Sequence, residues 1–254
     1  MRRALLIGMV ATVLTALAAG TAVALHLQVG NTLVDATATI APSTLPANGN
    51  APVEVTSVVK VSTRDGSPPP KLTKLVLQFD KHGTVDTRGL PTCTMAKLAG
   101  KTTKAARAAC PGAIVGGGLG KAVVAFPDRA PFEISSPLVF FNAPPTEGKP
   151  TLIAHAYEKV PVPNAILTPI VIERVAKGRY GYRAEIELPE IAAGYGSSTL
   201  SKATIGATRT RAGKAVGYAN AHCSGSRLQV YGTLSFAEGG FVNGTLVQAC
   251  RVGD

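Results

Sequence analysis

The sequence has no tryptophan, and aromatic residues make up only 5% of its 254 residues. A core must therefore be built mainly from valine, leucine, isoleucine and alanine, for which a hydrophobic content of 46% is sufficient. Basic residues exceed acidic ones, giving a formal net charge of +11. They are scattered and do not alternate with aromatics, so nucleic acid is not expected as a partner. The charge instead favours anionic partners such as envelope polymers or lipid headgroups.

Motifs for metal and nucleotide chemistry are also missing. The only histidines are His26, His82, His155 and His222. None belongs to a zinc-ligand spacing, and His155 is interpreted as a core or surface histidine. The stretch 80–86 lacks the repeated acidic ligands of a calcium loop and predicts a turn after a strand. The glycine-rich run 115–122 misses both phosphate-binding spacings and predicts a structural strand with a bulge or close packing. We assign no metal ligand, no cofactor and no cofactor-binding residue.

The sequence offers no recognisable nucleophile either. No GxSxG motif occurs, and Ser197 is interpreted as part of a Gly/Ser loop. Glu185 and Glu187 share a predicted strand face, but Arg179 and Arg183 lie on the same face, which is typical of an exposed surface. No catalytic residue is therefore assigned.

Residues 1–24 predict a secretory signal peptide. Arg2 and Arg3 precede an uncharged apolar run at 4–19, and the small residues 22–24 favour cleavage after Ala24. The alternative is an uncleaved membrane anchor, because uncharged residues continue to Leu25 and are numerous enough to span a bilayer.

Four cysteines in an exported chain predict disulfides. Three pairings are possible, and two local bridges, Cys93–Cys110 and Cys223–Cys250, are the simplest set. Cys223 and Cys250 each end a strand-like run, with a single strand at 228–236 between them. That arrangement brings both to the same end of a sheet.

The segment 91–112 carries the only helical pattern after the signal. One continuous helix would hold Cys93 and Cys110 ~25 Å apart, whereas a disulfide needs Cα atoms within about 7 Å. Gly100 can end a first short helix, and Thr102 or Thr103 can cap a second. We therefore predict a disulfide-stapled helical hairpin. The alternative is one basic surface helix with free thiols.

The rest of the chain predicts short strands separated by turn signals every eight to fifteen residues. The expected strands are 33–41, 53–61, 75–79, 113–126, 137–141, 151–158, 166–175, 179–188, 200–208, 215–222, 228–236 and 241–249. In the strand at 166–175, Pro169 predicts a sheet edge or a bulge. The fold class is therefore all-β, with mainly antiparallel sandwich or barrel-like sheets and one stapled helical hairpin. We divide the chain into a signal peptide at 1–24, a β-sandwich-like region at 25–90, the hairpin insert at 91–112 and a β-rich region at 113–254.

Five short runs carry a resemblance that covers most of the chain after the signal. They are LPTC at 90–93, ACPGAIVGGG at 109–118, AFPDRAPF at 125–132, AHAYEKVPVPNAI at 154–166 and VQACRVG at 247–253. Together they resemble a group of exported bacterial β-rich proteins that has no assigned activity. The resemblance implies an exported β-rich fold and supplies no catalytic residue.

These observations favour an exported, non-catalytic β-protein of the extracellular space or cell envelope. We expect a binding or structural module for a surface polymer, a lipid or another protein. The alternative is an exported hydrolase whose site assembles only in the fold.

Overall fold

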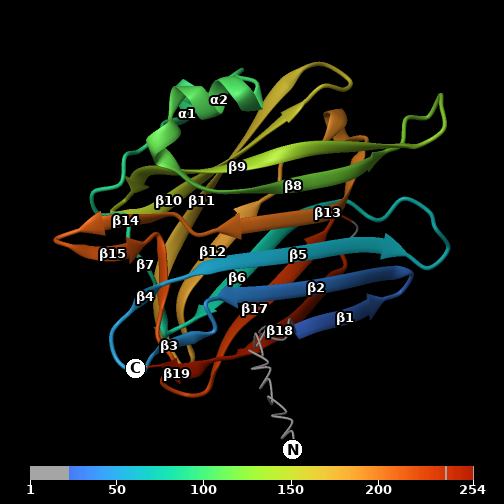
Figure 1. The fold of residues 1–254 in the computed structure, drawn as a ribbon. Coiled ribbons are helices and arrows are strands. Elements are labelled where there is room, and N and C mark those ends of the chain that lie inside the picture. The colour runs from blue at the N-terminus through green and yellow to red at the C-terminus, as the bar shows by residue number, and fades with distance from the viewer. Residues whose placement is uncertain (1–22, 238, 254) are drawn as a thin grey trace, which may run out of the picture.

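The computed structural model describes residues 23–237 and 239–253; residues 1–22, with most of the predicted signal peptide, lie outside them. The main feature is an antiparallel sheet of 12 strands in the order β1-β2-β5-β13-β8-β9-β10-β11-β12-β6-β17-β18 (Figure 1). The bounds are β1 Val23–Val29, β2 Thr32–Ala41, β5 Glu54–Thr63, β6 Leu72–Asp80, β8 Ile114–Val124, β9 Phe132–Thr146, β10 Lys149–Glu158, β11 Asn164–Lys177, β12 Tyr180–Glu187, β13 Gly196–Ile205, β17 Arg227–Phe236 and β18 Phe241–Ala249. The all-β antiparallel prediction is confirmed.

The two edge strands of this sheet lie against each other. β1 and β18 stand at opposite ends of the strand order yet are in contact, so the sheet curls into a near-barrel (Figure 1). Gly244 of β18 makes room for this closure, because a Cβ there would overlap the side chain of Leu25. Strands from 25–90 and from 113–254 alternate around the wall, with β13 between β5 and β8, and β6 between β12 and β17.

Alternation along each strand separates the inside of the barrel from the outside. In β5 the valine face, including Val55, Val59 and Val61, lines the interior, while Glu54 and Lys60 are exposed. In β12 the apolar face also points inward, with Tyr182, Ala184 and Ile186 lining the interior. This period of two is the physical reason that these segments become strands with one apolar face.

Short strands gather at one end of the barrel. They are β3 Thr44–Pro46, β4 Ala51–Pro52, β7 Gly83–Val85, β14 Thr208–Arg211, β15 Lys214–Gly217, β16 Ala219–Ala221 and β19 Arg251–Gly253. They form the sheets β4-β16-β7, β14-β15 and β3-β19. The Cys223–Cys250 bridge forms here as predicted, with its Cα atoms 5.9 Å apart. We call this the disulfide end of the barrel.

Two strand predictions need correction. The expected strand 215–222 is two strands in different sheets, because β15 pairs with β14 while β16 turns to pair with β4 and β7. The expectation that Pro169 marks a sheet edge or a bulge holds only locally, because β11 lies between β10 and β12 but is paired on one side alone at Pro169. Its missing N–H is accommodated because the pairing of β11 with β12 begins only at Val171.

The helical hairpin is confirmed. Helix α1 (Met95–Leu98) and helix α2 (Thr103–Ala109) flank Gly100, whose φ is +66°. Thr102 caps the second helix, its hydroxyl accepting the Ala105 N–H at 3.3 Å, and the turn η1 (Pro111–Ala113) follows. Cys93 and Cys110 are bridged with Cα atoms 5.8 Å apart, so the alternative of one helix with free thiols is wrong.

The hairpin covers the outer face of β9 and β10 (Figure 1). Leu98 and Ala106 are fully buried there against Val139, Phe141 and Ile153. This stretch of wall is therefore apolar on both faces. Within the described residues, no helix is both long and apolar enough to cross a membrane.

The glycine-rich strand β8 passes very close to β13. A Cβ on Gly116 or Gly118 would overlap a backbone carbonyl of β13, that of Thr204 or Lys202 respectively. The register with β9 also shifts between Ile114 and Gly116, as in a β-bulge. The structural interpretation of this run is confirmed.

Gly118→Ala should lower the free energy of unfolding by about 1–3 kcal/mol or more, because the methyl group meets a backbone carbonyl that cannot move aside. Gly120→Ala in the same strand is the matched control. Its Cβ would lie 3.7 Å from Leu138 Cδ2, an ordinary contact, so stability should be unchanged or rise by about 0.4–1 kcal/mol. Urea denaturation of both variants measures the change in the free energy of unfolding. Equal changes for the two variants would contradict the close approach of β8 to β13.

Candidate ligand-binding cavity

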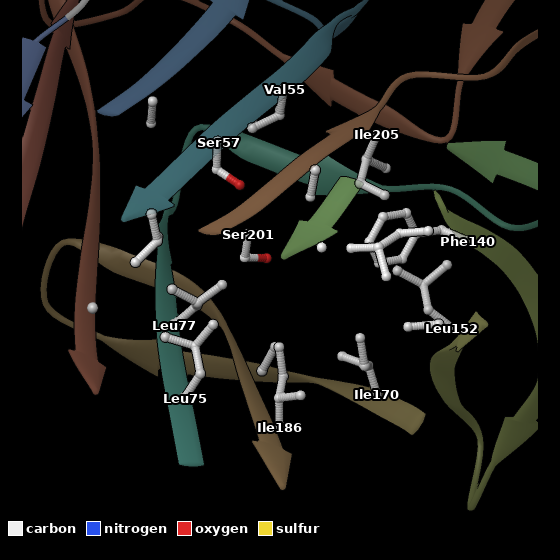
Figure 2. Close-up of a pocket in the computed structure, with 18 of the residues that line it drawn as sticks. Val55, Ser57, Leu75, Leu77, Phe140, Leu152, Ile170, Ile186, Ser201 and Ile205 are labelled. Carbon is white, nitrogen blue, oxygen red and sulfur yellow. The ribbon is translucent and has the colours of Figure 1, made fainter. Parts of the chain in front are cut away.

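The interior of the barrel contains a cavity of about 1010 Å³. Its walls are the inward faces of strands from around the sheet, and Figure 2 shows part of this lining. The apolar lining includes Val34, Ala36, Val55, Val59, Leu75, Leu77, Phe140, Leu152, Ala154, Ile170, Ile172, Ala184, Ile186, Ala203, Val230 and Leu246. Side chains of this kind make poor partners for ions or sugars and good ones for hydrocarbon.

Several hydroxyl groups interrupt this apolar wall, among them those of Ser57, Thr168 and Ser201. Ser57 of β5 and Ser201 of β13 point into the cavity on neighbouring strands (Figure 2). Neither hydroxyl forms a hydrogen bond with another described residue. They are therefore available to donate to, or accept from, a molecule in the cavity. Sequence reasoning missed both, although Ser57 stands within the valine face of β5, where a polar residue at an inward position is the available signal.

The disulfide end of the cavity is covered by the small sheets. A cluster of Leu45, Val53, Ala221 and Leu228 packs around the Cys223–Cys250 bridge. Beside it Tyr218, at 1% exposure, packs against Val115 and Phe140 and lines the cavity. Its hydroxyl has no hydrogen-bond partner among the described residues, and burial raises the pKa of this phenol. The covering is thus mainly hydrophobic.

At the opposite end of β10 the lining becomes polar. Glu158 is buried and both its carboxylate oxygens lie within hydrogen-bond distance of the Ala192 N–H, at 3.2 and 3.4 Å. Burial raises the pKa of Glu158, and the Ala192 hydrogen bond opposes that shift. Ala192 begins the turn η2 (Ala192–Gly194), where Ala192 and Ala193 both have positive φ. Lys159, Pro189 and Ile191 complete this end of the lining.

A cluster of charged side chains around the partly buried Asp86 attaches the β14–β15 hairpin to the disulfide end. The Asp86 carboxylate contacts Arg88 at 2.7 Å, Arg209 at 3.1 Å and Arg211 at 3.4 Å. Arg209 also donates to the carbonyl oxygens of Asp86 and Arg88. The hydrogen bond from Arg88 is the main cause that lowers the pKa of Asp86 to about 2. Two of the basic residues of this hairpin, Arg209 and Arg211, are therefore held in the structure by Asp86.

A second polar cluster lies at the same end. Asp80, the last residue of β6, is 4% exposed and accepts the backbone N–H groups of His82 and Gln229 at 3.1 and 3.2 Å. His82 Nε2 lies 2.8 Å from Ser224 Oγ, and its ring stacks edge-on against His222 with centroids 4.9 Å apart. Burial, and then the neighbouring His82, lower the pKa of His222. The structure thus brings two of the four histidines together.

The other residues considered from sequence lie elsewhere. His155 is fully buried beneath the helical hairpin, where Nε2 contacts the Lys101 carbonyl oxygen at 2.9 Å, so it is a core histidine. Glu185 and Glu187 form ion pairs with Lys74 on the outer face. Ser197 is not in a loop as expected but is buried at the start of β13, where it pairs with Val123. Among the described residues, no group of three or more acidic, histidine or cysteine side chains is placed to hold a metal ion.

Comparisons with known protein families, with curated proteins and with solved structures found no match for this chain.

Tyr218→Phe should leave the free energy of unfolding unchanged or raise it by about 1 kcal/mol, because it removes a buried hydroxyl that lacks a partner. Tyr182→Phe, in the same cluster, is the control and should change it by less than about 0.5 kcal/mol. Chemical denaturation measures both. A clear loss of stability for Tyr218→Phe would show that the hydroxyl has a partner after all.

Asp86 should make folding stability depend on pH. The pKa of Asp86 in the folded protein, about 2, lies below its ordinary value of 3.8. The ionised carboxylate therefore stabilises the fold fully at any pH above 3.8, and this stabilisation is lost as the pH falls through about 2. Wild type should therefore lose stability between about pH 4 and pH 2. Asp86→Asn should be less stable at neutral pH and lose less over that range.

Glu54→Gln, on the exposed outer face of β5, is the control for Asp86→Asn and should follow wild type. Thermal melts from neutral pH down to about pH 2 measure all three proteins. Parallel pH profiles for wild type and Asp86→Asn would show that the arginine cluster does not act through this carboxylate.

Proposed function

We propose that this protein is an exported carrier that binds an apolar, lipid-sized molecule inside the barrel. The observation that carries the proposal is the cavity of about 1010 Å³ with its apolar lining. Ligand cavities commonly measure ~300–1,000 Å³ and combine apolar walls with a few placed polar groups. Export is supported by the predicted signal peptide and by two disulfides, which form and persist in oxidising compartments.

The ligand class follows from the position of the polar groups. Ser57 and Ser201 offer hydrogen bonds partway along a wall that is mainly apolar (Figure 2). They suit a hydroxyl, carbonyl or ester oxygen attached to a hydrocarbon body. We therefore favour an uncharged amphiphile, such as a fatty alcohol or ester, as the occupant.

Of the partner classes that the sequence suggests, the cavity favours a lipid over a polymer or a protein. An anionic polymer would be held by the scattered surface charge, and its binding would weaken steeply with salt. A molecule inside the barrel is held by burial of apolar surface, which salt does not screen. These two modes predict different responses to chain length and to salt.

Straight-chain alcohols of increasing length, competing against a fluorescent apolar probe, test the proposal. Each added methylene buried in the cavity contributes about 0.8 kcal/mol, so the dissociation constant should fall about fourfold per carbon until the cavity is filled. Raising the salt concentration should leave the constant nearly unchanged. Affinity that is independent of chain length would contradict binding in the cavity.

Three variants locate the bound molecule. Ser201→Trp should obstruct the cavity and abolish binding, whereas Lys202→Trp, at a position of the same strand that does not line the cavity, should bind like wild type. Ser57→Ala should weaken alcohol binding by roughly 2- to 10-fold, the loss of one hydrogen bond, while leaving the hydrocarbon probe unaffected. Equal losses for Ser201→Trp and Lys202→Trp would place the ligand outside the barrel.

A further inference from the structure

Three side chains from distant parts of the sequence meet at the disulfide end in the order hydroxyl, imidazole, carboxylate. Ser224 Oγ lies 2.8 Å from His82 Nε2, and His82 Nδ1 lies 2.9 Å from Asp80 Oδ1. The serine and the histidine are 142 residues apart in the chain. This is the order of groups in which a base activates a nucleophile and an acid orients the base.

The carboxylate of this group is held rigidly. Asp80 is almost fully buried, accepts two backbone N–H groups, and has Arg179 Nε 3.5 Å from its other oxygen. The Nδ1 of His82 is close to the carboxylate but not aligned with it as a hydrogen bond, so Asp80 acts on the ring through its charge. A negative charge beside Nδ1 favours the proton on that nitrogen and leaves the Nε2 lone pair free to accept the Ser224 O–H.

The hydroxyl is also accessible from solvent. Ser224 is exposed, and the His82 side chain is 20% exposed. Ser224 directly follows Cys223, so the Cys223–Cys250 bridge restrains the backbone that carries the hydroxyl. An accessible serine beside a restrained imidazole meets the geometric requirement for nucleophilic catalysis.

We propose that Ser224 is an acyl-accepting nucleophile with His82 as its general base, which gives the protein an ester-cleaving activity. Ser224 Oγ forms a bond to the ester carbonyl carbon while its proton passes to His82 Nε2. The alcohol leaves with that proton as the old C–O bond breaks, and the acyl group stays on Ser224. Water then attacks the acyl carbon, His82 takes a proton from the water and returns it to Oγ, and the carboxylic acid departs.

This activity is independent of the proposed carrier function. Asp80 lines the cavity, as do Gly83 and Ala221 on either side of the cluster, but Ser224 and His82 are not among the described residues that line it. The hydroxyl therefore faces outward from the same wall, and its substrate is an ester that arrives from solvent. Loss of either function in a variant does not require loss of the other.

Reaction of the folded protein with a fluorophosphonate, which phosphonylates activated serines with loss of fluoride, tests the proposal. Peptide mapping by mass spectrometry should find the label on Ser224 and at least tenfold less on Ser226, an exposed serine of the same loop. This comparison is made within one wild-type molecule and needs no variant to fold. Ser224→Ala should abolish the labelling, and Ser226→Ala should not.

The role of His82 is tested by His82→Gln, with His222→Gln as its matched control. Loss of the base should slow labelling of Ser224 by about 100-fold, whereas His222, which stacks on His82, can be replaced with little effect. Thermal melts show that each variant is folded, and hydrolysis of 4-nitrophenyl butyrate should follow the labelling rates. Equal labelling of Ser224 and Ser226 in wild type would overturn the proposal, and so would undiminished labelling of Ser224 in folded His82→Gln. The Ser224–His82 hydrogen bond would then serve only to hold two loops together.

Discussion

The rest of this structure depends on how large the barrel is relative to the side chains that line it. A barrel of about eight strands has an interior that side chains can fill, and larger barrels enclose space. Here 12 strands form the wall, the chain contains no tryptophan, and many inward positions carry valine, alanine, serine or glycine. Side chains of this size cannot fill the interior of a barrel with this many strands. The apolar interior is therefore a lined cavity rather than a packed core.

Local patterns predicted those elements whose structure is decided locally. The strands expected at 53–61 and 179–188 form as β5 and β12, because their apolar and polar residues alternate with the period of two that a half-buried strand requires. The hairpin followed from a conflict between helix length and disulfide reach, which only a chain reversal near Gly100 resolves. The segment 215–222 was predicted wrongly, and the position of Pro169 only in part, because their pairing depends on distant strands. β12 pairs with β11 only beyond the proline, and β16 turns away from β15.

The candidate sites could not be predicted from the sequence for a related reason. A cavity exists only once the number of strands and their closure are known, and no single segment encodes either. Within one strand, Ser57 is simply a polar residue in a valine face, and its meaning depends on Ser201 of the neighbouring β13 (Figure 2). The Ser224–His82–Asp80 group likewise has no spacing to detect, since a turn after β6 and a loop before β17 meet only through the sheet order.

The contact between β1 and β18 also has a consequence for how the chain folds. The first and the last strand of the sheet complete the wall, and β13 pairs with β5 and β8, which lie far from it in the sequence. Contacts between such distant segments form slowly, because the entropy of closing long loops opposes them. Until β18 reaches β1, the apolar inner faces and two unpaired strand edges stay open to neighbouring chains, a state prone to aggregation. The same strand order that encloses the interior therefore has a cost during folding. The chain stays prone to aggregation until its last sheet strand, β18, has docked against β1.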